Sequence, residues 1–360
     1  MVEWKFLNDI CGIYDGTHQT PKYTDSGVKF VSVENISDPY RSQKYISEDD
    51  FSRNYKTKPQ KGDVLMTRIG DVGTCTVLDN DEPIAYYVSL ALLRPNSQLV
   101  LSNYVKYILE SNIGKRELRK KTLLTAVPLK INLGVGKLKL PIPSMEEQNR
   151  IVGILDTFTA SIDNLKEQIA QRRKQYEYYR DQLLDLEGKE GVEMKALGEV
   201  CEISRGVRVV KRDLEEFGII PVFQNSLLPL GYYAISNNNG NTFVIIGGAA
   251  GDIGYSEKPF WAADDCLCIS GKKVLVDKYI YNFLISIQHY LKSQVRKAGV
   301  PRLSRSVLDK LCIPVPPLPE QQRIVSILDT FEASIQNLEA QLSQREKQYD
   351  YYRNKLLTFE

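Results

Sequence analysis

One long segment occurs twice in this chain, and the repeat limits the folds available to it. Residues 147–184 and 320–357 align without a gap and are identical at 26 of 38 positions. Within each copy, apolar residues recur at alternating steps of four and three residues. A sustained 3.5-residue period is the seam of a coiled coil. Each copy is therefore predicted to form a helix of about 40 residues, roughly 60 Å long at 1.5 Å per residue.

The predicted seam has the same positions in both copies. One polar residue interrupts the apolar series at equivalent places, Arg172 in the first copy and Arg345 in the second. A polar seam residue commonly fixes the register of a coiled coil at some cost in stability. The apolar members are Ile151, Leu155, Phe158, Ile162, Leu165 and Ile169 in the first copy, and Ile324, Leu328, Phe331, Ile335, Leu338 and Leu342 in the second.

A helix of this length with a single apolar stripe needs a partner. The other copy in the same chain is the obvious one, and the long segment between the copies permits either orientation. Two equivalent repeats related by an internal two-fold axis run in opposite directions, which favours an antiparallel pair. The alternative is a coiled coil formed with a second chain.

The repeat continues into the segments that precede the helices. "WKFLNDICGIYDG" at 4–16 resembles "MKALGEVCEISRG" at 194–206, whereas the middles of the two segments share little. Short runs such as "GVKFVSV" and "TFVIIGG" are typical of strands. We therefore predict an α+β chain of two mixed α/β globular domains, each followed by a long helix. The expected boundaries are 1–145 and 193–318 for the domains, and 146–187 and 319–358 for the helices.

The sequence contains no recognisable catalytic or metal-binding motif. It lacks a phosphate-binding loop, and its two histidines, His18 and His289, are too few for a metal cluster or a triad. The six scattered cysteines are typical of idle thiols in a reducing cytoplasm. No apolar run approaches the roughly 20 residues that cross a bilayer. We expect a cytoplasmic chain with no catalytic residues, no metal, no cofactor of its own and no membrane contact.

Two segments carry a family resemblance: "PIPSMEEQNRIVGILD" at 141–156 and "PVPPLPEQQRIVSILD" at 314–329. With "DGTHQTPKY" at 15–23 and "DVLMTRIGDVG" at 63–73, they resemble the specificity subunit of type I DNA restriction–modification systems over essentially the whole chain. The resemblance implies two target-recognition domains, one for each half of a split site in double-stranded DNA. It also implies that the helices form an intramolecular antiparallel coiled coil, with pseudo-two-fold symmetry, that acts as the spacer.

The same resemblance assigns the chemistry to other subunits. It implies a complex with two methyltransferase subunits, which would bind S-adenosylmethionine, and with restriction/translocase subunits that cleave DNA. This chain would then recognise DNA without acting on it.

Contacts with DNA require cations for phosphates and Arg, Lys, Asn, Gln or His side chains for base edges. The net charge of +2 is small, so the candidates are local groups, and each could equally be a solvated surface charge. The second glycine-rich segment, "IGGAAGDIG", lacks an equivalent of Arg68, which argues against a shared contact by this loop. The candidates are His18, Gln19, Lys22, Arg68, Lys115, Arg116, Arg119 and Lys120 in the first domain, and Arg205, Arg208, Lys211, Arg212, Arg302 and Arg305 in the second.

Two other functions stay open from the sequence. A coiled-coil scaffold with protein-binding globular ends would not show salt-dependent binding to duplex DNA. A stand-alone methyltransferase is the weaker alternative, because "DPY" at 38–40 lacks the second proline of the Asn-Pro-Pro-Tyr motif.

Overall fold

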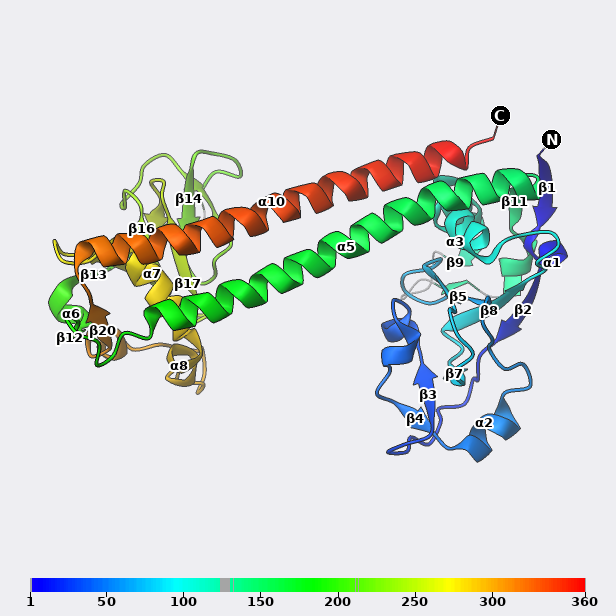
Figure 1. Cartoon of the computed structure of the whole chain (residues 1–360), viewed down its shortest axis with the longest axis horizontal. Helices are drawn as coiled ribbons and strands as arrows, with labels where there is room; N and C mark the ends of the chain where they lie inside the picture. The colour runs from blue at the N-terminus through cyan, green and yellow to red at the C-terminus, as the bar shows by residue number, and fades with distance from the viewer. Residues whose placement is uncertain (1, 124–129, 132, 211, 213, 360) are drawn as a thin grey trace. The chain divides into compact units, whose positions relative to one another are not determined.

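The computed structural model describes residues 2–123, 130–131, 133–210, 212 and 214–359. Its contacts divide the chain into two compact units, Met1–Leu165 with Gln341–Glu360, and Lys166–Ala340. Each unit holds one globular domain and part of both long helices, α5 (Met145–Leu184) and α10 (Leu318–Leu356) (Figure 1). The two long helices predicted from the repeat are therefore confirmed.

The first domain is built from small sheets flanked by short helices. Its largest sheet contains, in order, β2 (Cys11–Asp15), β8 (Leu90–Pro95), β5 (Val64–Thr67) and β6 (Cys75–Val77). A second sheet contains β4 (Tyr45–Ile46), β3 (Val28–Val31) and β7 (Ile84–Tyr86), and two pairs join β1 (Glu3–Phe6) to β11 (Lys139–Ile142) and β9 (Thr122–Leu123) to β10 (Lys130–Ile131). The helices are α1 (Leu7–Ile10), α2 (Glu48–Asn54), α3 (Ser102–Glu110) and α4 (Asn112–Lys121), with 3₁₀ turns at Val33–Asn35, Pro39–Arg41 and Leu133–Lys137.

The second domain repeats this plan. Its largest sheet contains, in order, β13 (Cys201–Arg205), β19 (Cys266–Gly271), β16 (Asn241–Ile245) and β17 (Ile253–Ser256). The three-stranded sheet contains β15 (Gly231–Tyr233), β14 (Ile220–Phe223) and β18 (Trp261–Ala262), and β12 (Glu193–Ala196) pairs with β20 (Cys312–Val315). The helices are α6 (Leu197–Val200), α7 (Asp277–Ser286), α8 (Gln288–Ser293) and α9 (Arg305–Asp309).

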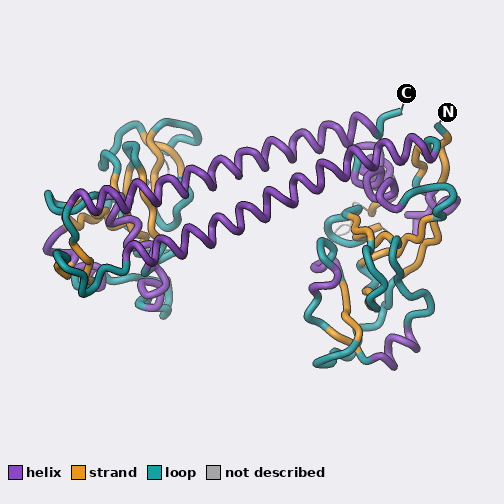
Figure 2. Tube along the Cα trace, viewed as in Figure 1, coloured by secondary structure: helices purple, strands orange, loops and turns teal. Residues whose placement is uncertain are grey.

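The middles of the two domains have the same topology although their sequences share little. In each three-stranded sheet, the central strand pairs antiparallel on one side and parallel on the other: β3 with β4 and β7, and β14 with β15 and β18. Both domains combine strands, short helices and loops (Figure 2), and the strands of the two larger sheets follow one another in the same order along the chain. The duplication therefore includes the segments in which the sequence comparison found little in common.

Strands β5 and β16 show why such different sequences keep one fold. Val64 and Met66 of β5 face one apolar core and Leu65 faces another. In β16, Val244 faces one core and Phe243 the other. A strand covered on both faces needs a continuous apolar run rather than an alternating one. Many apolar residues satisfy that requirement, so the sequence can vary while the strand stays in place.

The long helices run antiparallel within each unit. In the first unit the ring of Phe158 stacks on that of Tyr352, with centroids 5.3 Å apart, and Arg345 lies 5.7 Å from the Phe158 ring centre. In the second unit the equivalent Phe331 stacks on Tyr179 at 5.4 Å, and Arg172 lies 5.8 Å from the Phe331 ring centre. The same cluster thus forms twice with α5 and α10 exchanged, as a pseudo-two-fold repeat requires. The predicted intramolecular antiparallel pair is confirmed.

The seam residues nearest the globular domains are the most deeply buried. Ile151 and Leu155 join the core of the first domain, and Ile324 and Leu328 join that of the second. Further along the helices, Ile162 and Ile169 are buried, whereas Phe158, Leu165, Phe331, Ile335, Leu338 and Leu342 are partly exposed. The helices are therefore anchored mainly where they join the domains.

A buried glutamine holds each domain to the helix that follows it. Gln148 Nε2 donates to the carbonyls of Leu99 and Pro143, both at 3.0 Å, and its Oε1 accepts from Leu101 N–H at 3.0 Å. Gln321 makes the matching three bonds in the second domain, to Val274 and Pro316 carbonyls and from Val276 N–H, at 2.8–2.9 Å. Both side chains are fully buried, so their amides satisfy backbone groups that water cannot reach.

Replacing Gln148 with leucine is expected to lower the free energy of unfolding by about 3 kcal/mol, because one buried N–H and two carbonyls lose their partner. Gln321→Leu should have a similar effect through the second domain. Chemical denaturation followed by circular dichroism measures both. Gln171→Leu, an exposed change on the same helix, should stay within about 0.5 kcal/mol of the parent. Equal stabilities for the Gln148, Gln321 and Gln171 variants would show that the buried amides do not hold the junction.

Candidate nucleic-acid interface

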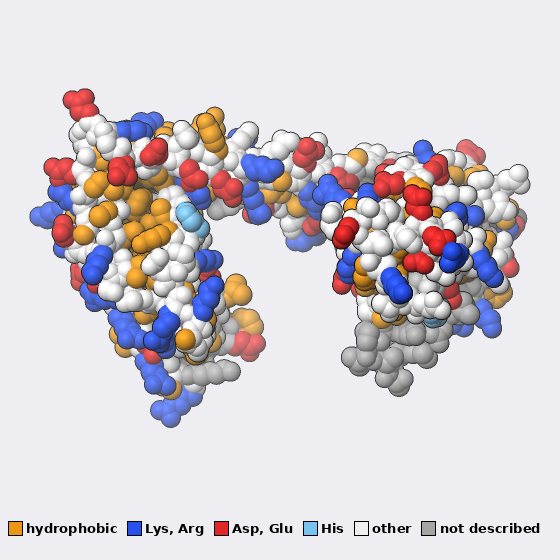
Figure 3. All heavy atoms as spheres, turned by 90° about the horizontal axis from the view of Figure 1, so that it is seen from below, with side chains coloured by type: hydrophobic (Ala, Val, Ile, Leu, Met, Phe, Trp, Pro, Cys, Tyr) orange, Lys and Arg blue, Asp and Glu red, His pale blue; other side chains and the backbone are white. Residues whose placement is uncertain are grey.

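Helix α4 concentrates positive charge in the first domain. Lys115, Arg116, Arg119 and Lys120 are all exposed on it. Lys and Arg side chains lie at the surface of both domains (blue in Figure 3). Of the four cations on α4, Lys120 pairs with Glu117 at 2.5 Å. Lys115 and Arg119 also line a groove of about 420 Å³ that continues to the loop at 70–72. An exposed cationic helix face of this kind is suited to a row of phosphates.

The structure places Arg68 inside the first domain. Its side chain is only 5% exposed, Nη1 donates to the carboxylate of Asp15, and Nε donates to the carbonyl of Ile131 at 3.3 Å. Arg68 therefore fixes the loop that begins beside it, and a direct contact with DNA would require these bonds to break. The prediction that Arg68 contacts DNA stays untested, and a structural role explains its environment better.

Ile246 occupies the position of Arg68 in the second domain. The N–H of each residue donates at 2.8 Å, Arg68 to Ser89 and Ile246 to Asp265, and each carbonyl accepts at 3.0 Å from Ile131 or Leu303. Gly70 and Gly248 follow two residues later, both with φ of 79°, a left-handed value that favours glycine. The loop is thus shared, while the arginine is not, as the sequence comparison indicated.

Two of the predicted arginines of the second domain meet on one turn. The turn joins β18 to β19 and contains Asp264 and Asp265. Arg205 Nε donates to the carbonyl of Asp264 at 2.8 Å, and Arg302 Nη1 donates to Asp265 Oδ1 at 3.2 Å. Residues nearly 100 positions apart in the sequence therefore share one surface, which we call the β18–β19 corner.

Gln224 and Asn225 lie at the same corner and were missed by the sequence analysis. They follow β14 directly, and Asn225 accepts a hydrogen bond from Ala249 N–H at 2.9 Å. Asn225 is exposed and Gln224 is partly exposed. Neither belongs to a charged cluster or to a recognisable motif, so no local signal in the sequence distinguished them from ordinary loop residues.

The remaining candidates are exposed but dispersed. His18, Gln19 and Lys22 lie in the loop after β2, and Gln19 and Lys22 line a shallow hollow with Tyr55. Arg305 pairs with Asp309 at 3.3 Å on α9. Arg208 and Arg212 lie in the segment after β13, and Lys211 lies outside the described residues.

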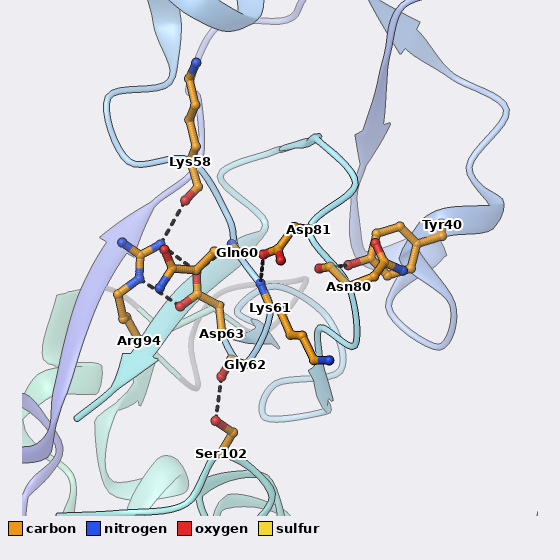
Figure 4. A network of polar contacts seen from close by, with 10 residues as sticks. All are labelled: Tyr40, Lys58, Gln60, Lys61, Gly62, Asp63, Asn80, Asp81, Arg94 and Ser102. Carbon is orange, nitrogen blue, oxygen red and sulfur yellow. Dashed lines mark hydrogen bonds and ion pairs between the residues drawn. The ribbon is translucent and has the colours of Figure 1, made fainter. Parts of the chain in front are cut away.

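An ion pair with a buried carboxylate supports the first domain from within. Arg94 of β8 binds both oxygens of Asp63, at 2.8 and 2.7 Å, and also the carbonyl of Lys58 (Figure 4). Asp63 is buried and precedes β5 directly. The hydrogen bonds to Asp63 raise the pKa of Arg94. Charge-assisted bidentate bonds of this type are strong, so the pair fixes β5, and the loop after it, against β8.

Neither metal binding nor chemistry at the buried thiols of Cys11 and Cys201 is supported by the described residues. They include no group of three or more His, Cys, Asp or Glu side chains that could hold a metal ion. Burial raises the pKa of the Cys11 thiol to about 12, and that of Cys201 likewise to about 12, so neither supplies a thiolate near neutral pH. His289 is exposed on α8. Within the described chain, no helix is both long and apolar enough to span a membrane.

Comparison with known sequences identifies the class of protein that this architecture represents. The profile of the type I restriction modification DNA specificity domain matches the chain twice, at residues 1–172 and 189–346. The chain therefore belongs to this family, as the resemblance predicted.

Three named specificity subunits illustrate the relationship. The EcoR124I/EcoR124II specificity subunit of Escherichia coli is 32% identical over 262 residues, which cover 61% of this chain and 63% of that protein. A type I specificity subunit from Haemophilus influenzae is 31% identical, with coverage of 62% and 64%. One from Mycoplasma pneumoniae is 30% identical over 62% of this chain and 87% of its own length. The chain thus spans less than two thirds of the first two relatives.

Solved structures share the fold. The S subunit of a type I restriction–modification system from M. genitalium matches with a TM-score of 0.68 at 16% identity, covering 100% of this chain and 97% of that one. A chain from a structural study of type I complex assembly matches with a TM-score of 0.61, also at 16% identity, covering 99% and 96%.

Replacing Arg68 with methionine is expected to lower the free energy of unfolding by about 1–3 kcal/mol, because the Asp15 carboxylate and the Ile131 carbonyl lose a bonded donor. The combined change Arg68→Met with Asp15→Asn should cost less than the two single changes added together, since the residues are in contact. Urea denaturation of the four proteins measures the coupling. Strict additivity would show that the observed pair contributes nothing to the fold.

Proposed function

We propose that this chain is the DNA sequence-specificity subunit of a type I restriction–modification complex. In this function each globular domain reads one half of a split site in double-stranded DNA, and the paired helices set the gap between the halves. One observation carries the proposal. Two domains of one topology hold different exposed side chains on a helix pair that repeats its own contacts. A DNA site with two unlike halves requires two different recognition domains, and a duplicated fold provides them.

The half-sites should differ because equivalent places in the domains carry different chemistry. Asp15 ends β2 and Arg205 ends β13, so an acid in one domain corresponds to a base in the other. The first domain also carries the cationic face of α4, whereas Lys292 of the corresponding α8 is paired with Asp252 at 2.8 Å. A DNA site read by such unlike surfaces has no reason to be palindromic.

The proposed partners follow from the same arrangement. Two methyltransferase subunits would dock on the outer faces of the helices, and these would bind S-adenosylmethionine and perform the chemistry. Restriction/translocase subunits would complete the complex in the cytoplasm. The duplicated outer faces support two equivalent docking sites: Tyr178 of α5 is 61% exposed, and its repeat equivalent Tyr351 of α10 is 58% exposed.

A scaffold with protein-binding ends remains the second candidate, and one observation favours it. Phe217, Ile219 and Leu228 of the second domain are 79%, 91% and 78% exposed, and large exposed apolar side chains often mark protein contacts. Binding of the chain, with its partner subunits, to duplex DNA over a range of salt concentrations separates the two functions. A steep fall in affinity with salt supports DNA recognition, and no binding at low salt supports the scaffold.

Inserting one heptad into each long helix is expected to lengthen the gap of the DNA site and leave its half-sites unchanged. Seven residues placed after Gln168 and after Gln341 add about 10 Å to the pair, so the gap should grow by a few base pairs. The measurement is methylation of a random-sequence library by the reconstituted complex, followed by sequencing. Seven residues inserted after Gly188, beyond the end of α5, provide the control. A change in half-site bases at constant gap would contradict the spacer role, and methylation by this chain alone would contradict its non-catalytic role.

Substituting one outer tyrosine is expected to weaken one methyltransferase site and leave the other intact. Tyr178→Ala and Tyr351→Ala should each lower the affinity of one subunit by about 2 kcal/mol, as for an aromatic anchor, and the double variant should weaken both sites. Native mass spectrometry during titration measures the stoichiometry. Tyr23→Ala, an exposed change in the first domain, serves as the control. If each single variant weakened both sites equally, the duplicated faces would not be the docking sites.

A further inference from the structure

We infer that the β18–β19 corner reads the bases of the half-site that belongs to the second domain, with Gln224, Asn225 and Arg302 as the side chains that determine the sequence. The inference rests on the proposed function and assigns a role within it. It depends on how three segments, distant in the chain, are brought together and on which donors and acceptors they present.

Backbone hydrogen bonds fix the three segments against one another. Ala263 N–H, on the turn, donates to the carbonyl of Phe223 at 2.8 Å. Ala249 N–H donates to the carbonyl of Asn225 at 2.9 Å, and Gly248 N–H donates to that of Pro301 at 3.3 Å. These bonds tie the end of β14, the loop after β16 and the segment before α9 into one surface. The backbone positions of Gln224, Asn225 and Arg302 are therefore fixed by hydrogen bonds between these three segments.

Arg302 is buttressed by a carboxylate and still reaches solvent. Its side chain is 48% exposed, while that of its partner Asp265 is 19% exposed. The close approach depends on Gly247, where an added Cβ would meet Asp265 Oδ1 at 2.5 Å. A guanidinium has five N–H donors, and the contact with Asp265 occupies one of them. Enough donors remain for the bidentate contact that arginine makes with guanine.

Asn225 and Gln224 add the complementary amide groups. An added Cβ on Gly248 would lie 2.8 Å from Asn225 Cβ, and Gly248 is hydrogen-bonded to the residue before Arg302, so Asn225 lies beside the segment that carries Arg302, and Gln224 precedes Asn225 directly. Asparagine and glutamine pair with adenine in the same bidentate manner. The corner therefore offers groups for more than one base pair along a groove.

The charge balance favours base edges over phosphates as the target. Arg302 pairs with the carboxylate of Asp265, and Asp264 lies on the same turn as Asp265, so acids partly offset the charge of Arg205 and Arg302. A surface whose cations are partly offset by acids gains less from the phosphate backbone, whose attraction depends on uncompensated cations. Helix α4 is the contrasting case, because its exposed cations outnumber its single acid, Glu117.

The first domain fills the equivalent corner differently. Tyr87 N–H donates to the carbonyl of Val31 at 3.0 Å, as Ala263 does to Phe223, so Ser32 and Val33 correspond to Gln224 and Asn225. Neither of them provides an amide. The same backbone arrangement thus carries different side chains in the two domains. The base preference of the second domain should therefore depend on side chains that the first domain lacks.

The test uses the complex of this chain with its methyltransferase subunits and a random-sequence duplex library. Gln224→Ala, Asn225→Ala and Arg302→Ala are each expected to reduce the preference for particular bases about tenfold or more. All three should affect the same half-site, with the other half-site and the gap unchanged. Arg302→Lys keeps the charge but not the bidentate geometry, so it should relax the same positions as Arg302→Ala.

Two sets of controls keep the result interpretable. Lys273→Ala, an exposed change elsewhere in the second domain, should leave every base preference intact. Lys115→Ala with Arg119→Ala should weaken binding and reduce its salt dependence without changing base preference. Thermal unfolding of each variant shows whether the domain remains folded.

Retention of all base preferences by the three folded corner variants, with or without weaker binding, would overturn the inference. So would relaxation of both half-sites by a single corner variant. A parent complex that methylates no bipartite site would instead refute the proposed function, which makes the two failures distinguishable.

Discussion

The junction between each globular domain and its long helix is the constraint on which the rest of the structure depends. The long helices are stabilised mainly by burial of their apolar seam residues. These residues are most deeply buried where each helix joins the core of a domain. Gln148 and Gln321 complete these junctions with three hydrogen bonds each. Because polar groups buried there must be satisfied, the amides fix how each domain is attached to its helix. The recurrence of this glutamine in both copies of the repeated motif thus has a physical reason.

Within each globular domain, the residues that stabilise the fold are different from the residues that are exposed at the surface. Strands β5 and β16 are buried on both faces and accept any suitable apolar run. Exposed side chains at strand ends can then change without loss of the core. The end of β2 carries Asp15 and the end of β13 carries Arg205 on the same frame. Such a division allows one topology to present two unrelated surfaces.

The sequence was sufficient to predict the features that are periodic or repeated. The 3.5-residue period predicted both helices, and the matched ends of the repeat predicted two domains of mixed α and β structure. Contacts between distant segments could not be predicted in the same way. Arg68 was interpreted as a surface cation because nothing in "TRIGD" shows that Asp15, more than 50 residues earlier, will be its partner. Gln224 and Asn225 were overlooked because an uncharged loop residue gains meaning only from its neighbours in space.

The placement of charge explains how one chain can combine weak general attraction with selectivity. The net charge of +2 is too small for a strong attraction to nucleic acid as a whole. Uncompensated cations are instead gathered on α4, whereas Arg302 of the β18–β19 corner pairs with the carboxylate of Asp265. In the proposed function, α4 contributes affinity for DNA of any sequence, and the β18–β19 corner discriminates between base sequences. An arginine fixed by a carboxylate loses less conformational freedom on meeting a base, so the acid that pairs with Arg302 also makes this arginine the more selective reader.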